Sequence, residues 1–180
     1  EIRSGIAETR ELAANGRQTL AGVRFSAHPD GGLVSLKKFG ASVRITRAPG
    51  SRLELANFRV ERDGYELLPV GYRIIRLRDG SDLVNGTVGA TETAVEFAVA
   101  FASDETSTPA GRTYSVTTEV RGAERGDTIE VRFVRTPGAR TVTGRLTPNA
   151  FFLSTGGGLA GPLIDLGTGP FPMPPDPARF

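Results

Sequence analysis

Few residues of the types that catalysis or transition-metal binding requires occur in this sequence. It has no cysteine, and His28 is its single histidine. A Ser-His-Asp triad would have to use His28, which lies in the turn-like run His28–Gly32, and no Gly-x-Ser-x-Gly nucleophile motif occurs. A lone histidine also leaves only carboxylates to complete a metal site. We therefore expect His28 to be an exposed loop residue and the protein not to be an enzyme.

Calcium is the one metal for which the sequence offers ligands. The run from 78 to 82 contains Asp79 and Asp82, and Asp104 precedes Glu105. Oxygen-rich loops of this kind bind Ca²⁺, but the spacing of Asp79 and Asp82 does not match an EF-hand. These two residues are a weak calcium candidate, with turn formation as the alternative role. No other metal and no cofactor is expected.

For three further functions the sequence contains only part of the residue pattern that each requires. Glycoside hydrolysis needs two carboxylates across a cleft, but the strand glutamates have outward parity and the chain has no Trp to hold a sugar. Gly156–Gly158 lacks the Gly-Lys-Ser/Thr of a phosphate-binding loop. A possible basic strip is interleaved with acidic residues and has no aromatic stacking motif, so nucleic-acid binding is not expected. The glutamates are Glu54, Glu61, Glu96, Glu119 and Glu130, and the arginines are Arg44, Arg47, Arg52, Arg59 and Arg62.

Alternation of apolar and polar residues predicts that these side chains are carried by β-strands. Apolar residues recur at every second position in several runs, which is the period of a half-buried strand. The predicted inward positions include Phe39, Ala41, Val43, Ile45, Leu20, Val23, Phe25, Val95, Phe97, Val99, Tyr114, Val116, Val120, Ile129, Val131 and Phe133. About nine or ten such strands favour a single Ig-like or jelly-roll-like antiparallel β-sandwich, an all-β fold.

Two local signals sharpen this prediction. Leu53 and Leu55 share one parity whereas Phe58 and Val60 share the other, so the phase slips near Ala56 and a β-bulge is expected. The dipeptide at positions 63 and 64, Asp-Gly, separates two strand-like runs and predicts a two-residue hairpin.

The two ends of the chain differ from the middle. Six of the 12 prolines lie in residues 155–180, together with six glycines and scattered apolar residues, and such a segment cannot build a core of its own. We expect an N-terminal arm or edge strand over 1–14, a β-sandwich over 15–154 and an extended Gly/Pro-rich tail over 155–180. The candidate arm residues are Ile2, Ile6, Leu12, Leu163, Ile164, Leu166 and Phe171.

Composition and charge add little about partners. The net charge is +2, so nothing points to a polyanion partner, and no apolar run approaches the ~18 residues of a membrane span. The chain begins at Glu1 and not at Met, so either a leader was cleaved or the sequence was trimmed. Cleavage fits a β-rich exported protein better, and we expect export to the cell surface or beyond. Asn85-Gly86-Thr87 is then a candidate glycosylation site, although the motif also arises by chance.

The order of the strand and turn signals resembles a known family. The segments concerned are Leu20–Ala27, Val34–Val43, Leu55–Gly64, Ala94–Phe97, Pro109–Thr113 and Val116–Val131. This order is similar to that of Ig-like β-sandwich modules in secreted surface proteins and pilus-like filament subunits of bacteria and archaea. The likeness covers roughly residues 8–145, and each element is a general β signal of which only the order is specific. It implies a structural scaffold and carries over no catalytic residue.

Two functional hypotheses follow. In the first, the chain is a subunit of an extracellular filament or surface assembly, and copies join head to tail when a terminal arm adds a strand to the next subunit. The partner is then the chain itself, with other surface proteins or glycans as further candidates. In the second, the chain is a monomeric surface-anchored module that binds a cell wall or carbohydrate.

Overall fold

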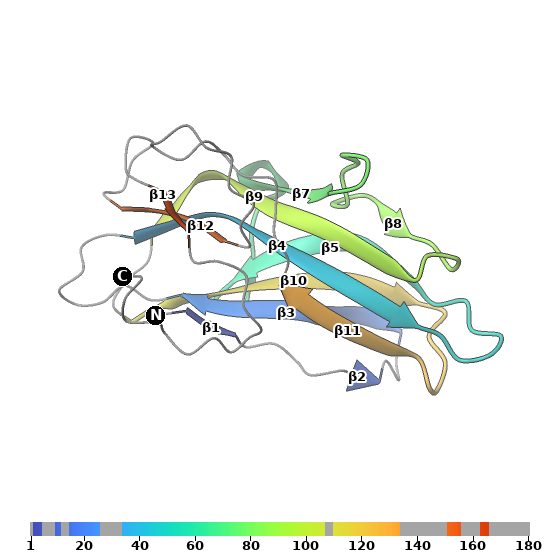
Figure 1. The fold of residues 1–180 in the computed structure, drawn as a ribbon. Coiled ribbons are helices and arrows are strands. Elements are labelled where there is room, and N and C mark those ends of the chain that lie inside the picture. The colour runs from blue at the N-terminus through green and yellow to red at the C-terminus, as the bar shows by residue number, and fades with distance from the viewer. Residues whose placement is uncertain are drawn as a thin grey trace.

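The chain folds into two antiparallel β-sheets that pack together, and one of them curls into a half-barrel (Figure 1). The computed structural model describes residues 2–4, 10–11, 15–25, 34–106, 110–133, 151–155 and 163–165. The predicted all-β sandwich is therefore confirmed. Within the described ranges the one helical segment is the short 3-10 turn η1 (Pro69–Gly71), and no helix there has the length and apolarity needed to cross a membrane.

Sheet A has six strands in the order β1-β3-β10-β5-β6, with β8 also pairing with β5. Its strands are β1 (Ile2–Ser4), β3 (Gly16–Phe25), β5 (Glu54–Arg62), β6 (Tyr65–Glu66), β8 (Thr87–Val88) and β10 (Arg112–Arg121). The central strand β10 is antiparallel to β3 on one side and to β5 on the other.

Sheet B has seven strands arranged on the long strand β4. They are β2 (Arg10–Glu11), β4 (Val34–Thr46), β7 (Tyr72–Arg76), β9 (Ala94–Thr106), β11 (Thr128–Phe133), β12 (Phe151–Thr155) and β13 (Leu163–Asp165). One edge of β4 pairs with β9, which carries β7 on its far side. Along the other edge of β4, β11 pairs with one part and β12 with the next part. β2 pairs with the outer edge of β11, and β13 pairs with the outer edge of β12.

The core forms where the alternating apolar faces of the two sheets meet. The predicted inward residues of β4, β10 and β11 whose side chains are described are all buried. Aromatic rings connect the sheets: Phe58 of β5 meets Phe97 of β9 edge to face at 5.7 Å, and Phe101 of β9 meets Tyr114 of β10 at 5.3 Å. The side chains of Phe25 and Phe133, which were also predicted to be buried, lie outside the described part of the chain.

The phase slip in β5 is a β-bulge, as predicted. The register with β10 shifts so that Thr117 faces Arg59 whereas Glu119 faces Ala56. Asn57 takes a left-handed conformation (φ 51°), which Asn tolerates better than most residues. The Thr118 hydroxyl then donates to the carbonyl of Ala56 at 2.7 Å, which satisfies a buried backbone acceptor beside the bulge.

At the bulge, two backbone N–H groups of β5 form hydrogen bonds with the connection between β7 and β9. The backbone N–H of Phe58 donates to the carbonyl of Leu83 at 3.2 Å, and the N–H of Leu83 donates to Ile74 of β7 at 2.8 Å. A second bond runs from the N–H of Asn57 to Gly86 at 3.1 Å. Because β5 belongs to sheet A and β7 to sheet B, this connection links the two sheets along one side of the sandwich.

The predicted Asp-Gly hairpin is also confirmed. Asp63 (φ 53°) and Gly64 (φ 85°) are both left-handed, as a two-residue hairpin turn between β5 and β6 requires. The Asp63 carboxylate accepts a hydrogen bond from the N–H of Thr113 at 2.8 Å, and the N–H of Asp63 donates to the carbonyl of Thr113 at 2.8 Å. The turn is thereby fixed to the start of β10.

We predict that Phe97→Ala lowers the free energy of unfolding by about 3–5 kcal/mol, because Phe97 is fully buried against Phe58 and its removal leaves a cavity between the sheets. Chemical denaturation followed by circular dichroism measures this. Glu96→Ala on the exposed side of the same strand is the control and should cost less than about 0.5 kcal/mol. Equal losses in the two variants would show that the inter-sheet packing is wrong.

Candidate functional site

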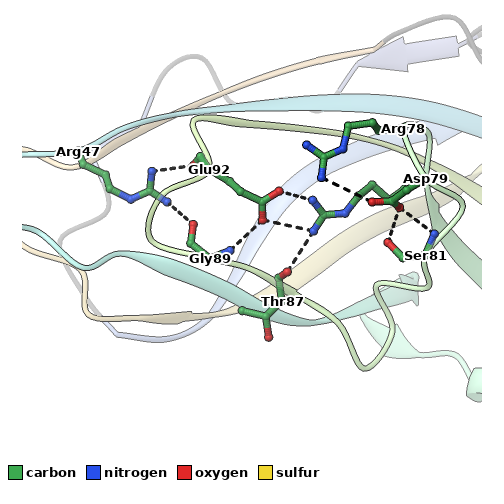
Figure 2. A network of polar contacts seen from close by, with 8 residues as sticks. Arg47, Arg78, Asp79, Ser81, Thr87, Gly89 and Glu92 are labelled. Atoms are coloured by element: carbon green, nitrogen blue, oxygen red, sulfur yellow. Dashed lines mark hydrogen bonds and ion pairs between the residues drawn. The ribbon is translucent and has the colours of Figure 1, made fainter.

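The most extensive polar cluster surrounds Arg76 at the end of β7. Its guanidinium forms an ion pair with the Glu92 carboxylate through Nη1, and Nη2 donates to the carbonyl of Thr87 at 3.1 Å. The side chain of Arg76 is only 9% exposed and that of Glu92 26%. The second Glu92 oxygen accepts the N–H of Gly89 at 3.0 Å. Figure 2 shows Glu92 between Arg47 on one side and the turn at Asp79 on the other.

Arg47, directly after β4, extends this cluster to the neighbouring loops. Its Nη1 donates to the carbonyl of Glu92 at 2.7 Å and its Nη2 to that of Gly89 at 3.0 Å (Figure 2). The same guanidinium binds the carbonyl of Leu53 through Nε and Nη2, at 3.0 and 2.9 Å. Arg47 therefore joins the start of β5 to the loop before β9 through hydrogen bonds to backbone carbonyls.

Opposing effects act on the pKa of Glu92. Burial by itself raises the pKa of this carboxyl, but the hydrogen bonds from Arg76 and Gly89, with the charge of Arg76, hold it below its ordinary value. The ionised form is thus stabilised in the folded protein. Arg76 and Glu92 thus form a partly buried ion pair in which both Nη atoms of Arg76 and both Glu92 oxygens have protein partners, whereas the buried Nε of Arg76 has none within the described part of the chain.

Sequence reasoning missed Arg76 and Glu92 and treated Arg47 only as part of a basic strip. A signal for Arg76 was nevertheless present. Arg76 shares strand parity with Tyr72 and Ile74, which are buried, so a charge on the inward face required an acidic partner. Nothing in the local pattern identifies Glu92 as that partner.

A second polar centre is Asp127, which is fully buried. Its carboxylate accepts the N–H of Ala48 at 2.7 Å, the Ser51 hydroxyl at 2.6 Å and the N–H of Glu124 at 2.8 Å. Burial raises the pKa of Asp127, but these three donors outweigh it and the pKa lies below its ordinary value. Asp127 therefore fastens the loop after β4 to the turn before β11.

Glu105 forms the third centre, where β9 and β10 approach. Its carboxylate accepts the Arg62 guanidinium at 2.9 Å and the Tyr114 hydroxyl at 3.0 Å. Burial, and then the negative charge of Glu105, raise the pKa of the Tyr114 phenol. The phenol stays protonated and acts as a hydrogen-bond donor, so this centre has a buried tyrosine without the properties of a nucleophile.

The calcium candidates Asp79 and Asp82 have turn-forming partners. Asp79 accepts the backbone N–H and the hydroxyl of Ser81, at 3.0 and 2.6 Å, and the Ser81 hydroxyl is the main cause of its lowered pKa. Asp82 accepts the N–H of Val84 at 2.8 Å and lies 3.8 Å from Arg73. Among the described side chains, no three of the His, Cys, Asp or Glu type gather into a metal-binding group. Calcium binding by this pair stays a prediction.

The other candidates from the sequence are dispersed. Of the basic strip, Arg59 binds the carbonyls of Phe58 and Val84, and Arg62 binds Glu105. The five strand glutamates are exposed or half-buried at separate positions. Asn85 is exposed, as a glycan acceptor must be. His28 and Gly156–Gly158 lie outside the described residues.

An exposed apolar segment follows the β5–β6 hairpin. Tyr65 is 79% exposed, Leu68 75% and Val70 86%, although all three fall within six residues. Beside Tyr65 lies an open hollow of about 490 Å³, which the hairpin shares with Gly111 and Arg112. Clustered exposed apolar residues are typical of contact surfaces, whereas single ones are not. The sequence analysis did not single out this segment.

The candidate arm residues fall partly within the described chain. Ile2 lies in β1, paired with Phe25 of β3, and Leu163 and Ile164 lie in β13, paired with Ser154 and Leu153 of β12. Ile6, Leu12, Leu166 and Phe171 lie outside the described residues. Strands from both chain ends thus occupy sheet margins in this single chain (Figure 1).

Comparison of the chain with models of protein families, with curated proteins and with solved structures finds no match. The sandwich-like all-β fold therefore rests on the strand pairing of the chain itself. The likeness to surface-protein modules noted in the sequence stays a hypothesis.

We predict that Arg76→Met lowers the free energy of unfolding by about 2–4 kcal/mol, because Glu92 then keeps a partly buried charge without its counter-ion. Arg76→Met combined with Glu92→Met should cost less than the sum of the two single changes, as a double-mutant cycle by urea denaturation will show. Arg73→Met, at an exposed arginine of the same strand, is the control and should cost less than about 0.5 kcal/mol. Additive losses at 76 and 92 would contradict the pairing.

We also predict a loss of stability in acid that originates in Glu92 and Asp127. Both carboxyls have a lowered pKa in the folded state, so their stabilisation is complete above their ordinary values of 4.5 and 3.8 and disappears as the pH falls through the lowered values. Glu92→Gln should therefore be less stable than the parent at pH 7 and lose less further stability between pH 5 and pH 2. Thermal unfolding across that range measures the difference, and parallel curves would contradict it.

Proposed function

We propose that this protein is a structural subunit of an extracellular filament or cell-surface assembly that polymerises through its terminal segments. The observation that carries the proposal is the position of the terminal strands. β1 and β2 from the N-terminal side, and β12 with β13 from the C-terminal side, make short pairings at the margins of both sheets. Short strands at sheet margins are elements that copies of a chain can exchange, and on the C-terminal side 17 residues separate β12 from β11.

The polar clusters support a structural role over a chemical one. The side chains of Arg76, Asp127 and Glu105 make hydrogen bonds that fasten loops and strands to each other. The resemblance to Ig-like modules of secreted surface proteins points the same way, and it is the basis for proposing an extracellular location. The proposed partner is another copy of the same chain, bound head to tail.

A monomeric binding module is the second candidate, and one observation favours it. The exposed segment of Tyr65, Leu68 and Val70 lies next to an open hollow that Arg112 helps to line. Tyr65 and Leu67 line this hollow together with the charged side chains of Arg62, Asp63, Glu66 and Arg112. An aromatic ring beside several polar groups is suited to a surface ligand such as a glycan or a cell-wall polymer. In that case the terminal segments would serve as linkers.

Light scattering after size exclusion, with negative-stain electron microscopy, separates the two candidates. We predict polymers whose fraction rises with protein concentration. Ile164→Asp in β13 should reduce polymers strongly, because a charge disfavours burial of the arm. Val70→Asp is the matched control outside the arms and should leave polymerisation intact. A 19.1 kDa monomer at every concentration would contradict the filament proposal and favour the binding module.

A further inference from the structure

Two strands lie end to end along one edge of β4. β11 pairs with Ala41–Thr46, its last residue Phe133 facing Ala41. β12 pairs with the rest of that edge and begins with Phe151 facing Phe39. Both strands are antiparallel to β4 and therefore run in the same direction, and only Gly40 lies between their ends. Figure 1 shows β11 beside one part of β4 and β12 beside the other.

The chain does not use the shortest way to extend this edge. If β11 simply continued, Val134 would face Gly40 and Arg135 would face Phe39. Instead, Phe151 faces Phe39, after 17 further residues, 134–150. The edge of β4 next to Val34–Phe39 is thus paired with β12. This strand continues the line of β11 along β4, but 17 residues of sequence separate the two strands.

We propose that the edge of β4 from Val34 to Phe39 is a strand-accepting site, and that in the assembly it holds Phe151–Thr155 of a neighbouring copy. This inference rests on the filament proposal and specifies the partner segment and the receiving edge. In the single chain the site is filled by the chain's own β12, with β13 paired outside it. In the assembly the same pairing forms between copies.

The receiving edge belongs to a well-packed part of the molecule. Ser35, Leu36 and Phe39 are at most 1% exposed, and the opposite edge of this part of β4 is bonded to β9. The pairing with β9 holds this part of β4 in the sheet independently of β12. The five residue pairs between β4 and β12 are the same within one chain and between two, so exchange conserves their hydrogen bonds and the balance depends on concentration.

The length of the connection permits the exchange. From Phe133 to Phe151 the chain has to span about 7 Å along β4, two residues of a strand. Seventeen residues reach about 55–60 Å when extended, which is enough to arrive at the same edge of an adjacent sandwich. Because donor and acceptor are different surfaces, the contact is heterologous, and it yields an open polymer unless the ring closes.

Cysteine cross-linking of the full-length chain tests the site. Ser35 and Ser154 are paired across β4 and β12, and the natural sequence has no cysteine to interfere. Paired residues of antiparallel strands have Cα atoms about 4.5–5.5 Å apart, a separation that a disulfide spans. We mix a Ser35→Cys chain with a Ser154→Cys chain, allow assembly, oxidise, and separate the products on a non-reducing denaturing gel. A disulfide between the two variants can form only between copies.

We expect cross-linked dimers from the mixture, and a ladder of higher multimers from the chain that carries both changes. The matched control uses Thr46→Cys and Thr128→Cys, a pair on the same edge of β4 but with β11. The doubly changed control should cross-link within each chain, and its mixture should give no dimers. Val34→Cys with Thr155→Cys repeats the test at the next register pair, in case Ser35→Cys does not fold.

The experiment can contradict the strand-accepting site and the filament proposal independently of each other. Filaments with disulfides only within chains would overturn the exchange of β12 and leave polymerisation to another contact. Cross-linked closed dimers without filaments would support the strand-accepting site and overturn the filament. Monomers with internal disulfides only would overturn both.

Discussion

The long strand β4 must find backbone partners along both of its edges, and sheet B is assembled around that requirement. Its thirteen residues present two rows of peptide groups, while Leu36, Phe39, Ala41 and Val43 anchor it in the core. β9 completes one edge. The other edge is divided between two segments that are distant in sequence. An unpaired row of this length would be a template for another chain, so the way this row is filled is the basis of the assembly that we propose.

The opposite side of the sandwich is closed by different means. The bulge in β5 turns the N–H groups of Asn57 and Phe58 toward the connection between β7 and β9. The ion pair of Arg76 with Glu92, and the carbonyl contacts of Arg47, then hold that connection in place. Charged groups inside a sandwich are tolerated because each is paired and hydrogen-bonded. These charges specify how the loops are arranged.

Two surfaces of the described chain are suited to contacts with other molecules. The strand-accepting edge and the apolar segment at Tyr65, Leu68 and Val70 differ in chemistry, because one offers backbone hydrogen bonds and the other exposed side chains. Backbone pairing recognises any strand of suitable length, so specificity has to come from the register and from the connection that delivers the strand. A copy of the same chain, the partner that we propose, would supply both. The apolar segment is suited to a partner that buries aromatic and aliphatic groups.

The sequence by itself determined the longer strands β3, β4, β5, β9, β10 and β11, many of their inward residues, the bulge in β5 and the turn at Asp63, because each depends on the period or conformation of neighbouring residues. It did not determine that Glu92 joins Arg76, that Asp127 fastens two loops, or that Phe151 follows Phe133 along β4. Those pairings join residues far apart in the chain, and many alternatives have the same local pattern. Only the tertiary structure decides among them, because the choice depends on which edges and buried charges still lack a partner once the sheets have packed.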